Sequence, residues 1–130
     1  MRYYREVGLG RLREHYPDGM ALSIGKKAQA AVPGITDPVA HGMRVLGKLR
    51  EYFNRGPVLA IRVGGEDAIK EVRRVTGYTD PATAEKGTIR GDLGRDSIEA
   101  STAEGRAVEN LVHASGDPEE AEAELRLWLS

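Results

Sequence analysis

The 130-residue sequence has no cysteine, which excludes disulfides and thiolate metal sites. No apolar run approaches the roughly 20 residues that span a bilayer, and the opening residues (MRYYRE) lack the apolar core of a signal peptide. Net charge is also small, since 19 basic and 20 acidic residues leave −1 at pH 7. There is thus no general electrostatic attraction to nucleic acid or anionic lipid. We expect a cytoplasmic protein that binds neither nucleic acid nor membranes.

Two common nucleotide-binding patterns are missing as well. The sequence has neither a Walker glycine–lysine motif nor a dinucleotide-binding glycine fingerprint. What is present is ordinary for a globular protein, with 40% hydrophobic and 30% charged residues. The length suits one domain with its own core, so we expect a single domain over residues 1–130.

Hydrophobic spacing predicts helices in the first half of the chain. Residues 3–15 fit a weak helix and residues 24–31 a short one, with a turn at YPDG, residues 16–19. Asp37, followed by a proline, offers the cap of a longer helix over residues 38–53. That helix has a broad apolar face, which indicates that it packs on a core.

The second half reads as a mixture of strands and helices. Residues 57–63 (PVLAIRV) are apolar and β-branched, which favours a buried strand. A helix is predicted over 66–75, then a long functional loop over 77–106 with little periodicity. A second short strand is expected at 108–112. A helix follows over 117–128, begun by an aspartate cap and a proline in its first position.

His113 is the first candidate for chemistry. It follows the second expected strand and precedes a small-residue turn and a well-capped helix. A junction of that kind suits a phosphate group, and a histidine there can act as nucleophile or base. A lone histidine is more often structural or incidental, and this pattern alone leaves that alternative open.

Glu124 strengthens the case. The apolar stripe of the last helix consists of Ala121, Leu125 and Trp128. Glu124 falls within that stripe. An inward carboxylate needs a partner, and His113 across the turn is a natural one, whose tautomer the carboxylate would fix. The alternative is that Glu124 sits at the edge of the stripe, in water.

Two arginines complete the set read from the residues alone. Arg73 lies on the predicted helix over 66–75 and would ordinarily be a solvated surface residue. Arg90 lies in a glycine-flanked segment, GTIRGD at residues 87–92, which suits close approach to a phosphate. Two guanidinium groups and a histidine nucleophile are what phosphoryl transfer needs.

Five blocks of the sequence resemble one known family. They are GPVLA at 56–60, VRRVTGYTDP at 72–81, GTIRGD at 87–92, NLVHAS at 110–115, and Glu124. In this order, over about residues 41–129, they resemble the nucleoside diphosphate kinases. The resemblance implies an α+β, ferredoxin-like fold with residues 41–130 as the family core and residues 1–40 as a divergent helical region.

The resemblance also implies a ping-pong reaction. A histidine takes the γ-phosphoryl group of a nucleoside triphosphate and passes it to a nucleoside diphosphate, and Mg²⁺ arrives on the nucleotide phosphates rather than on protein ligands. By resemblance His113 is the nucleophile, Glu124 orients it, and Ser115 supports the pair. The implied nucleotide-binding residues are Arg73, Thr79 and Arg90 for the phosphates, Asn110 for the sugar hydroxyl and an active-site lysine, Tyr16 near the phosphates, and Leu49 as an apolar wall for the base.

The sequence departs from the family in four places. The family's first strand, first helix and second strand have no counterpart, so the fold is expected to be incomplete at the N-terminus, without the lysine. Extra residues separate Tyr16 from Gly56 and Arg90 from Asn110. Val45 stands where the family stacks a phenylalanine on the base. The family's aspartate after Ser115 is Gly116 here.

We therefore expect a nucleoside diphosphate kinase that forms a homo-oligomer or a complex with a complementing N-terminal segment. Without the missing strand, the strands expected at 57–63 and 108–112 would lack their common neighbour. The first alternative is a non-catalytic nucleotide-binding or assembly subunit on the same scaffold, favoured by the absent lysine. A weaker alternative is an unrelated α/β interaction domain.

Overall fold

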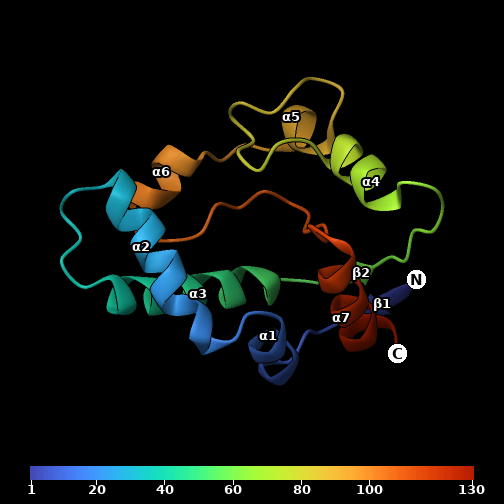
Figure 1. Ribbon diagram of the computed structural model, residues 1–130, viewed down its shortest axis with the longest axis horizontal. Helices are drawn as coiled ribbons and strands as arrows, with labels where there is room; N and C mark the ends of the chain where they lie inside the picture. The colour runs from blue at the N-terminus through green and yellow to red at the C-terminus, as the bar shows by residue number, and fades with distance from the viewer. The chain divides into compact units, whose positions relative to one another are not determined.

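The structure is a computed structural model that describes all 130 residues, and most of its regular elements are helices (Figure 1). In chain order they are β1 (Arg2–Tyr4), α1 (Leu9–His15), the 3-10 turn η1 (Asp18–Met20), α2 (Ala21–Ala31), α3 (Pro38–Phe53), β2 (Val58–Ala60), α4 (Ala68–Thr76), α5 (Ile89–Leu93), α6 (Ile98–Ala103) and α7 (Pro118–Leu129). None of the helices has both the length and the apolar character that crossing a bilayer requires.

The chain divides into two compact units, each described by itself. The first unit comprises residues 1–4, 59–97 and 109–130, and the second comprises residues 5–58 and 98–108. The expectation of a single domain stays a prediction.

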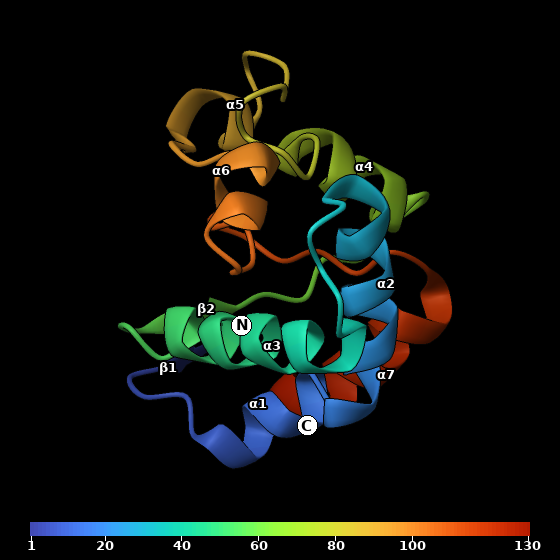
Figure 2. The same cartoon turned by 90° about the vertical axis from the view of Figure 1, so that its left-hand side faces the viewer.

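The second unit is built on the crossing of α2 and α3. Figure 2 shows α2 lying against the N-terminal part of α3. Glycines allow this approach, because a Cβ at Gly25 would stand 1.6 Å from the carbonyl oxygen of Pro38, and one at Gly42 1.8 Å from that of Ala21. Leu46 of α3 is completely buried. The broad apolar face predicted for residues 38–53 therefore does pack on a core.

Aspartate caps start α3 and α7 where the sequence predicts them. The Asp37 side chain accepts a hydrogen bond from the backbone N–H of Ala40 (3.1 Å), and α3 has the predicted bounds. The Asp117 side chain likewise accepts from the N–H of Glu120 (2.8 Å) and starts α7. The first unit is closed where Trp128 of α7 meets Tyr4 of β1, with ring centroids 5.3 Å apart and the Tyr4 hydroxyl donating to the Trp128 carbonyl.

The sheet differs from the expected one in its burial and contains a strand that the sequence did not predict. β2 keeps only three residues of the strand expected at 57–63, and it pairs with β1. The prediction of a strand buried on both faces fails, since Leu59, Ile61 and Val63 are 50%, 58% and 54% exposed. Only Leu59 of these lies in β2, whose two-stranded sheet of three-residue strands offers little surface to pack against, and Ile61 and Val63 lie beyond the strand.

Two further expectations need correction. Residues 108–112 form no strand. The carbonyl oxygens of Asn110 and Val112 accept hydrogen bonds from the Arg90 side chain, and that of Asn110 also accepts from the N–H of Val112, so these groups do not pair with a neighbouring strand. The long loop expected over 77–106 contains two short helices, α5 and α6. The hydroxyl of Thr88 caps α5 by accepting from the N–H of Gly91 (3.0 Å), a local signal that periodicity alone does not register.

Candidate active site

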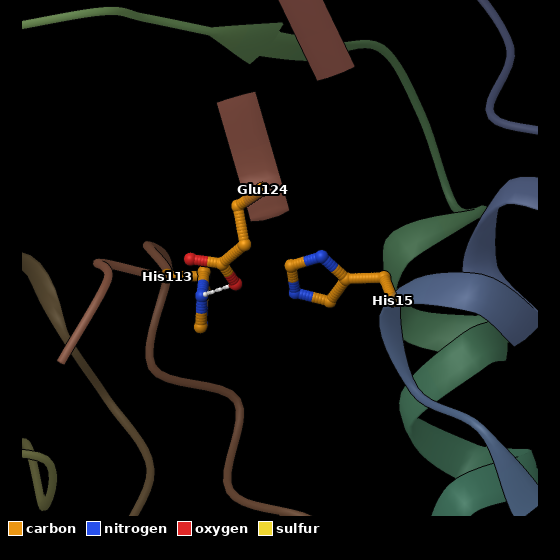
Figure 3. Close-up of side chains that lie close together, drawn as sticks. All are labelled: His15, His113 and Glu124. Carbon is orange, nitrogen blue, oxygen red and sulfur yellow. Dashed lines mark hydrogen bonds and ion pairs between the residues drawn. The ribbon is translucent and has the colours of Figure 1, made fainter. Parts of the chain in front are cut away.

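His113, Ser115 and Glu124 form a hydrogen-bonded network in the first unit. The Nε2 atom of His113 lies 2.5 Å from Oε2 of Glu124, the contact drawn in Figure 3. The hydroxyl of Ser115 donates to the other carboxylate oxygen, Oε1, also at 2.5 Å. The predicted contact between His113 and Glu124 is therefore present, and the carboxylate lies inward with its side chain 17% exposed.

The network sets which ring nitrogen of His113 can react. An ionised carboxylate only accepts hydrogen bonds, so Nε2 is the nitrogen that bears the proton. The lone pair of the neutral ring then lies on Nδ1. The imidazole side chain is 32% exposed, which leaves a nucleophile accessible from solvent while its orientation is fixed from the protein side.

A second carboxylate, not predicted from the sequence as a site residue, lies beside the same ring nitrogen. Oε1 of Glu120 stands 3.6 Å from Nε2 of His113, and the Glu120 side chain is 42% exposed. The sequence could have indicated Glu120, because it lies four residues before Glu124 and residues at that spacing share one face of a helix.

Arg90 is buried and bonds to backbone. Its guanidinium donates to the carbonyl oxygens of Gly77 (2.9 Å), Asn110 (3.3 Å) and Val112 (2.6 Å). Burial lowers the pKa of Arg90 from its usual value, and the positive charge of Arg73 lowers it further. Arginine still remains protonated in proteins, so the group is a charged donor.

The other predicted residues of the first unit lie around this segment. Asn110 donates from Nδ2 to the carbonyl oxygen of Thr79 (3.1 Å), which ties residue 110 to the stretch after α4. Arg73 is exposed in the last turn of α4, and its Nη1 stands 3.9 Å from where a Cβ on Gly116 would be. The structure thus brings Arg73 and Ser115 to the same α7 end of the first unit.

Tyr16 and Leu49 belong to the second unit. The backbone of Tyr16 ends α1, and its carbonyl oxygen accepts from Nη2 of Arg50 (2.6 Å). The same Nη2 donates to Oδ1 of Asp18 (2.8 Å). Leu49 is partly buried on α3, whereas Val45 is in the core at 8% exposure. Sequence reasoning missed Arg50, since nothing in its spacing separates a buried arginine from a solvated one.

Comparison with known proteins decides the family. The nucleoside diphosphate kinase family profile matches residues 39–130. The chain belongs to the nucleoside diphosphate kinase family. The chain is similar to the crystal structure of an NDP kinase from Pyrobaculum aerophilum, with a TM-score of 0.86 and 35% sequence identity. The match covers 99% of this chain and 77% of the Pyrobaculum aerophilum chain. The fold is therefore the α+β fold of this family, here rich in helix with a small sheet.

Other members of the family agree. A nucleoside-diphosphate kinase from Borrelia burgdorferi, solved as a transition-state mimic with bound vanadate and ADP, has a TM-score of 0.76 and 26% identity, covering 99% of this chain and 67% of that one. In sequence, the chain is 44% identical to the Pyrobaculum aerophilum nucleoside diphosphate kinase over 95 residues, which are 73% of this chain and 52% of the relative. It is 48% identical to the Archaeoglobus fulgidus enzyme over 82 residues, 63% of this chain and 48% of the relative. The chain spans about half the length of the curated relatives it matches.

Proposed function

We propose that the chain carries the phosphoryl-transfer centre of a nucleoside diphosphate kinase and that His113 is its nucleophile. The observation that supports this most directly is the shared carboxylate of Glu124, which accepts from Nε2 of His113 and from the Ser115 hydroxyl. In that arrangement the reactive lone pair lies on Nδ1 of a ring whose orientation is fixed.

The reaction proceeds in two balanced halves. In the first, the Nδ1 lone pair attacks the γ-phosphorus of a nucleoside triphosphate, an N–P bond forms, and the bridging P–O bond breaks with its electrons on the departing diphosphate. The positive charge that develops on the ring is stabilised by the carboxylate of Glu124 at Nε2. In the second, a phosphate oxygen of another nucleoside diphosphate attacks the phosphorus, and the N–P electrons return to Nδ1.

The nucleotide is held by the remaining predicted residues. Arg73 and Thr79 are exposed and available to phosphates, and Arg90 has used three of its five N–H donors on backbone. Asn110 is assigned to the sugar. Tyr16 and Leu49, which the resemblance assigns to the phosphates and the base, lie in the second unit, and their roles stay predictions. Burial of Val45 supports an altered base clamp, because that side chain is not presented to a ligand.

Mg²⁺, carried on the nucleotide as part of the substrate, would supply positive charge beside the transferring phosphates. The carboxylate of Glu124 fits a metal that is bound to the nucleotide rather than to the protein, because both of its oxygens already accept hydrogen bonds from His113 and Ser115. We place the protein in the cytoplasm, as a homo-oligomer or with a complementing strand segment beside β2.

The test is phosphorylation of the chain, together with any complementing segment, by γ-labelled ATP. We expect one acid-labile, base-stable phosphate per chain on the tryptic peptide of residues 107–126, whose only histidine is His113. His113→Asn should abolish the label. Acid-stable label on a serine, or full labelling of the variant, would overturn the assignment. A chain that binds nucleotide without taking label would instead be the non-catalytic subunit.

A further inference from the structure

The chain makes a strained turn two residues before His113. Leu111 has a φ of +74°, and the N–H of Val112 donates to the carbonyl oxygen of Asn110 at 2.9 Å. A hydrogen bond from residue i+2 back to residue i, around a residue with positive φ, is the rare form of the γ-turn. A leucine does not favour this conformation, so its surroundings must hold it there.

The guanidinium of Arg90 contacts both sides of this turn. Its Nε donates to the carbonyl oxygen of Asn110, just before Leu111, and its Nη2 to that of Val112, just after it. Its third donor, Nη1, reaches the Gly77 carbonyl at 2.9 Å. A planar guanidinium presents its donors at fixed spacing, which an ammonium group does not.

We propose that Arg90 is a positioning residue, which holds the γ-turn at Leu111 and thereby fixes the backbone from which His113 projects. The inference rests on the proposed function, in which His113 is the nucleophile. His113 is then fixed at two points. Glu124 orients the ring at Nε2, and Arg90 fixes the main chain two residues before it. A nucleophile fixed at both ends meets the phosphorus in a reactive geometry more often.

The structural half of the proposal is tested by amide hydrogen exchange at Val112. Arg90→Gln should raise the exchange rate of this N–H by about tenfold or more, because the turn loses the donors that hold it. Arg90→Lys should do nearly the same, since it keeps the charge but not the planar fork, and it serves if the glutamine variant folds poorly. Arg74→Gln is the control, because Arg74 donates only to Glu71 on the surface of α4. Unchanged exchange in both Arg90 variants would overturn the proposal.

A suppressor separates positioning from phosphate binding. Glycine adopts positive φ readily, so Leu111→Gly should restore Val112 protection and phosphorylation in the Arg90→Gln background. If Arg90 acted only by binding phosphate, removing strain at Leu111 would restore nothing. That result would overturn the positioning role.

Labelling kinetics complete the test. At saturating ATP the rate of phosphohistidine formation in Arg90→Gln should fall about ten- to hundredfold, in addition to any rise in the half-saturating ATP concentration that comes from a lost phosphate contact. A raised half-saturating concentration with an unchanged rate would contradict positioning and make Arg90 a phosphate ligand alone. If the wild-type chain takes no label, the proposed function fails, while the exchange rates still decide whether Arg90 holds the turn.

Discussion

At the scale of single residues, Glu124 is the acceptor on which the candidate active site depends. Its two oxygens accept from different donors, the His113 ring and the Ser115 hydroxyl. A carboxamide cannot replace it, because glutamine has only one acceptor oxygen and its NH₂ group would face a donor. The side chain is also mostly buried, so an unmatched donor there has little access to water.

We therefore expect Glu124→Gln to slow phosphohistidine formation by about ten- to hundredfold, without unfolding the chain. Glu122→Gln is the matched control, since Glu122 lies on the same helix, is 73% exposed and pairs only with Arg126. The measurement is the rate of acid-labile labelling from γ-labelled ATP. Equal rates in the two variants would remove Glu124 from the mechanism.

In the second unit, Arg50 is a buried charged residue that holds a turn. Only 10% of its side chain is exposed, and its Nη2 holds the Tyr16 carbonyl and the Asp18 carboxylate. Its Nε atom is buried without a partner. The two hydrogen bonds stabilise the turn after α1, and the unpaired N–H offsets part of that gain.

We expect the loss of the Arg50 side chain to change the stability of the fold. Arg50→Ala should lower the free energy of unfolding by about 1–2 kcal/mol. Lys48→Ala, which removes an exposed pair with Glu51 on the same helix, should cost about 0–0.5 kcal/mol. Urea unfolding followed by circular dichroism measures both, with each variant in the same assembled form (homo-oligomer or complex with the complementing segment) and at one protein concentration. Equal unfolding midpoints for the two variants would show that the hydrogen bonds of Arg50 contribute no more to stability than an exposed ion pair.

At the scale of elements, the α2–α3 crossing depends on two glycines. Gly25 and Gly42 each lie where a Cβ would overlap a carbonyl oxygen of the facing segment. Because backbone rather than a flexible side chain occupies that space, the helices would have to separate to admit a methyl group. Gly47, further along α3, has no atom within 4 Å of its Cβ position.

The two sites predict opposite effects of the same substitution. Gly42→Ala should destabilise the chain by about 1–3 kcal/mol through the clash. Gly47→Ala should stabilise it by about 0.5–1 kcal/mol, since alanine favours a helix interior over glycine. Thermal unfolding of the two variants against wild type, all in the same assembled form and at one protein concentration, checks the signs. A stabilised Gly42→Ala would mean that the helices do not cross as closely as described.

Elements whose signals are local were predictable from the sequence, and elements defined by their partners were not. The α3 and α7 helices carry their own aspartate caps and prolines, so their starts could be predicted. β2 could be recognised as a strand, but its partner β1 lies more than 50 residues away and has no strong pattern of its own. Residues 108–112 resemble a strand, yet Arg90 and the turn at Leu111 take their backbone groups.

The same distinction applies to the candidate site. The contact between His113 and Glu124 was predictable, because Glu124 lies in the apolar stripe of one well-signalled helix and His113 lies just before the start of that helix. The backbone contacts of Arg90 were not, since a guanidinium that donates to three carbonyls leaves no mark on spacing or composition. The positive φ of Leu111 carries no signal either, because leucine is not a residue chosen for that conformation.

At the scale of the whole molecule, the sheet is too small for the apolar residues that it presents. It has two strands of three residues each, which is marginal in water. β2 pairs with β1 along one edge, and the apolar side chains of Leu59, Ile61 and Val63 in and beyond it are about half exposed or more. An uncovered strand edge with apolar neighbours recruits strands from other chains.

The last prediction follows from that edge. Expressed alone, the 130-residue chain should self-associate or unfold without a sharp transition, as judged by size-exclusion chromatography and thermal unfolding. A lysine on an exposed edge strand opposes pairing, so Leu59→Lys should shift the chain towards monomer. Tyr78→Lys should not, because Tyr78 is 63% exposed but lies outside the sheet. A complementing segment that supplies a strand next to β2 should likewise restore a monomer-like, cooperative transition. If the wild-type chain is instead monomeric and unfolds cooperatively with no added segment, then two short strands suffice, and the need for a complementing partner is refuted.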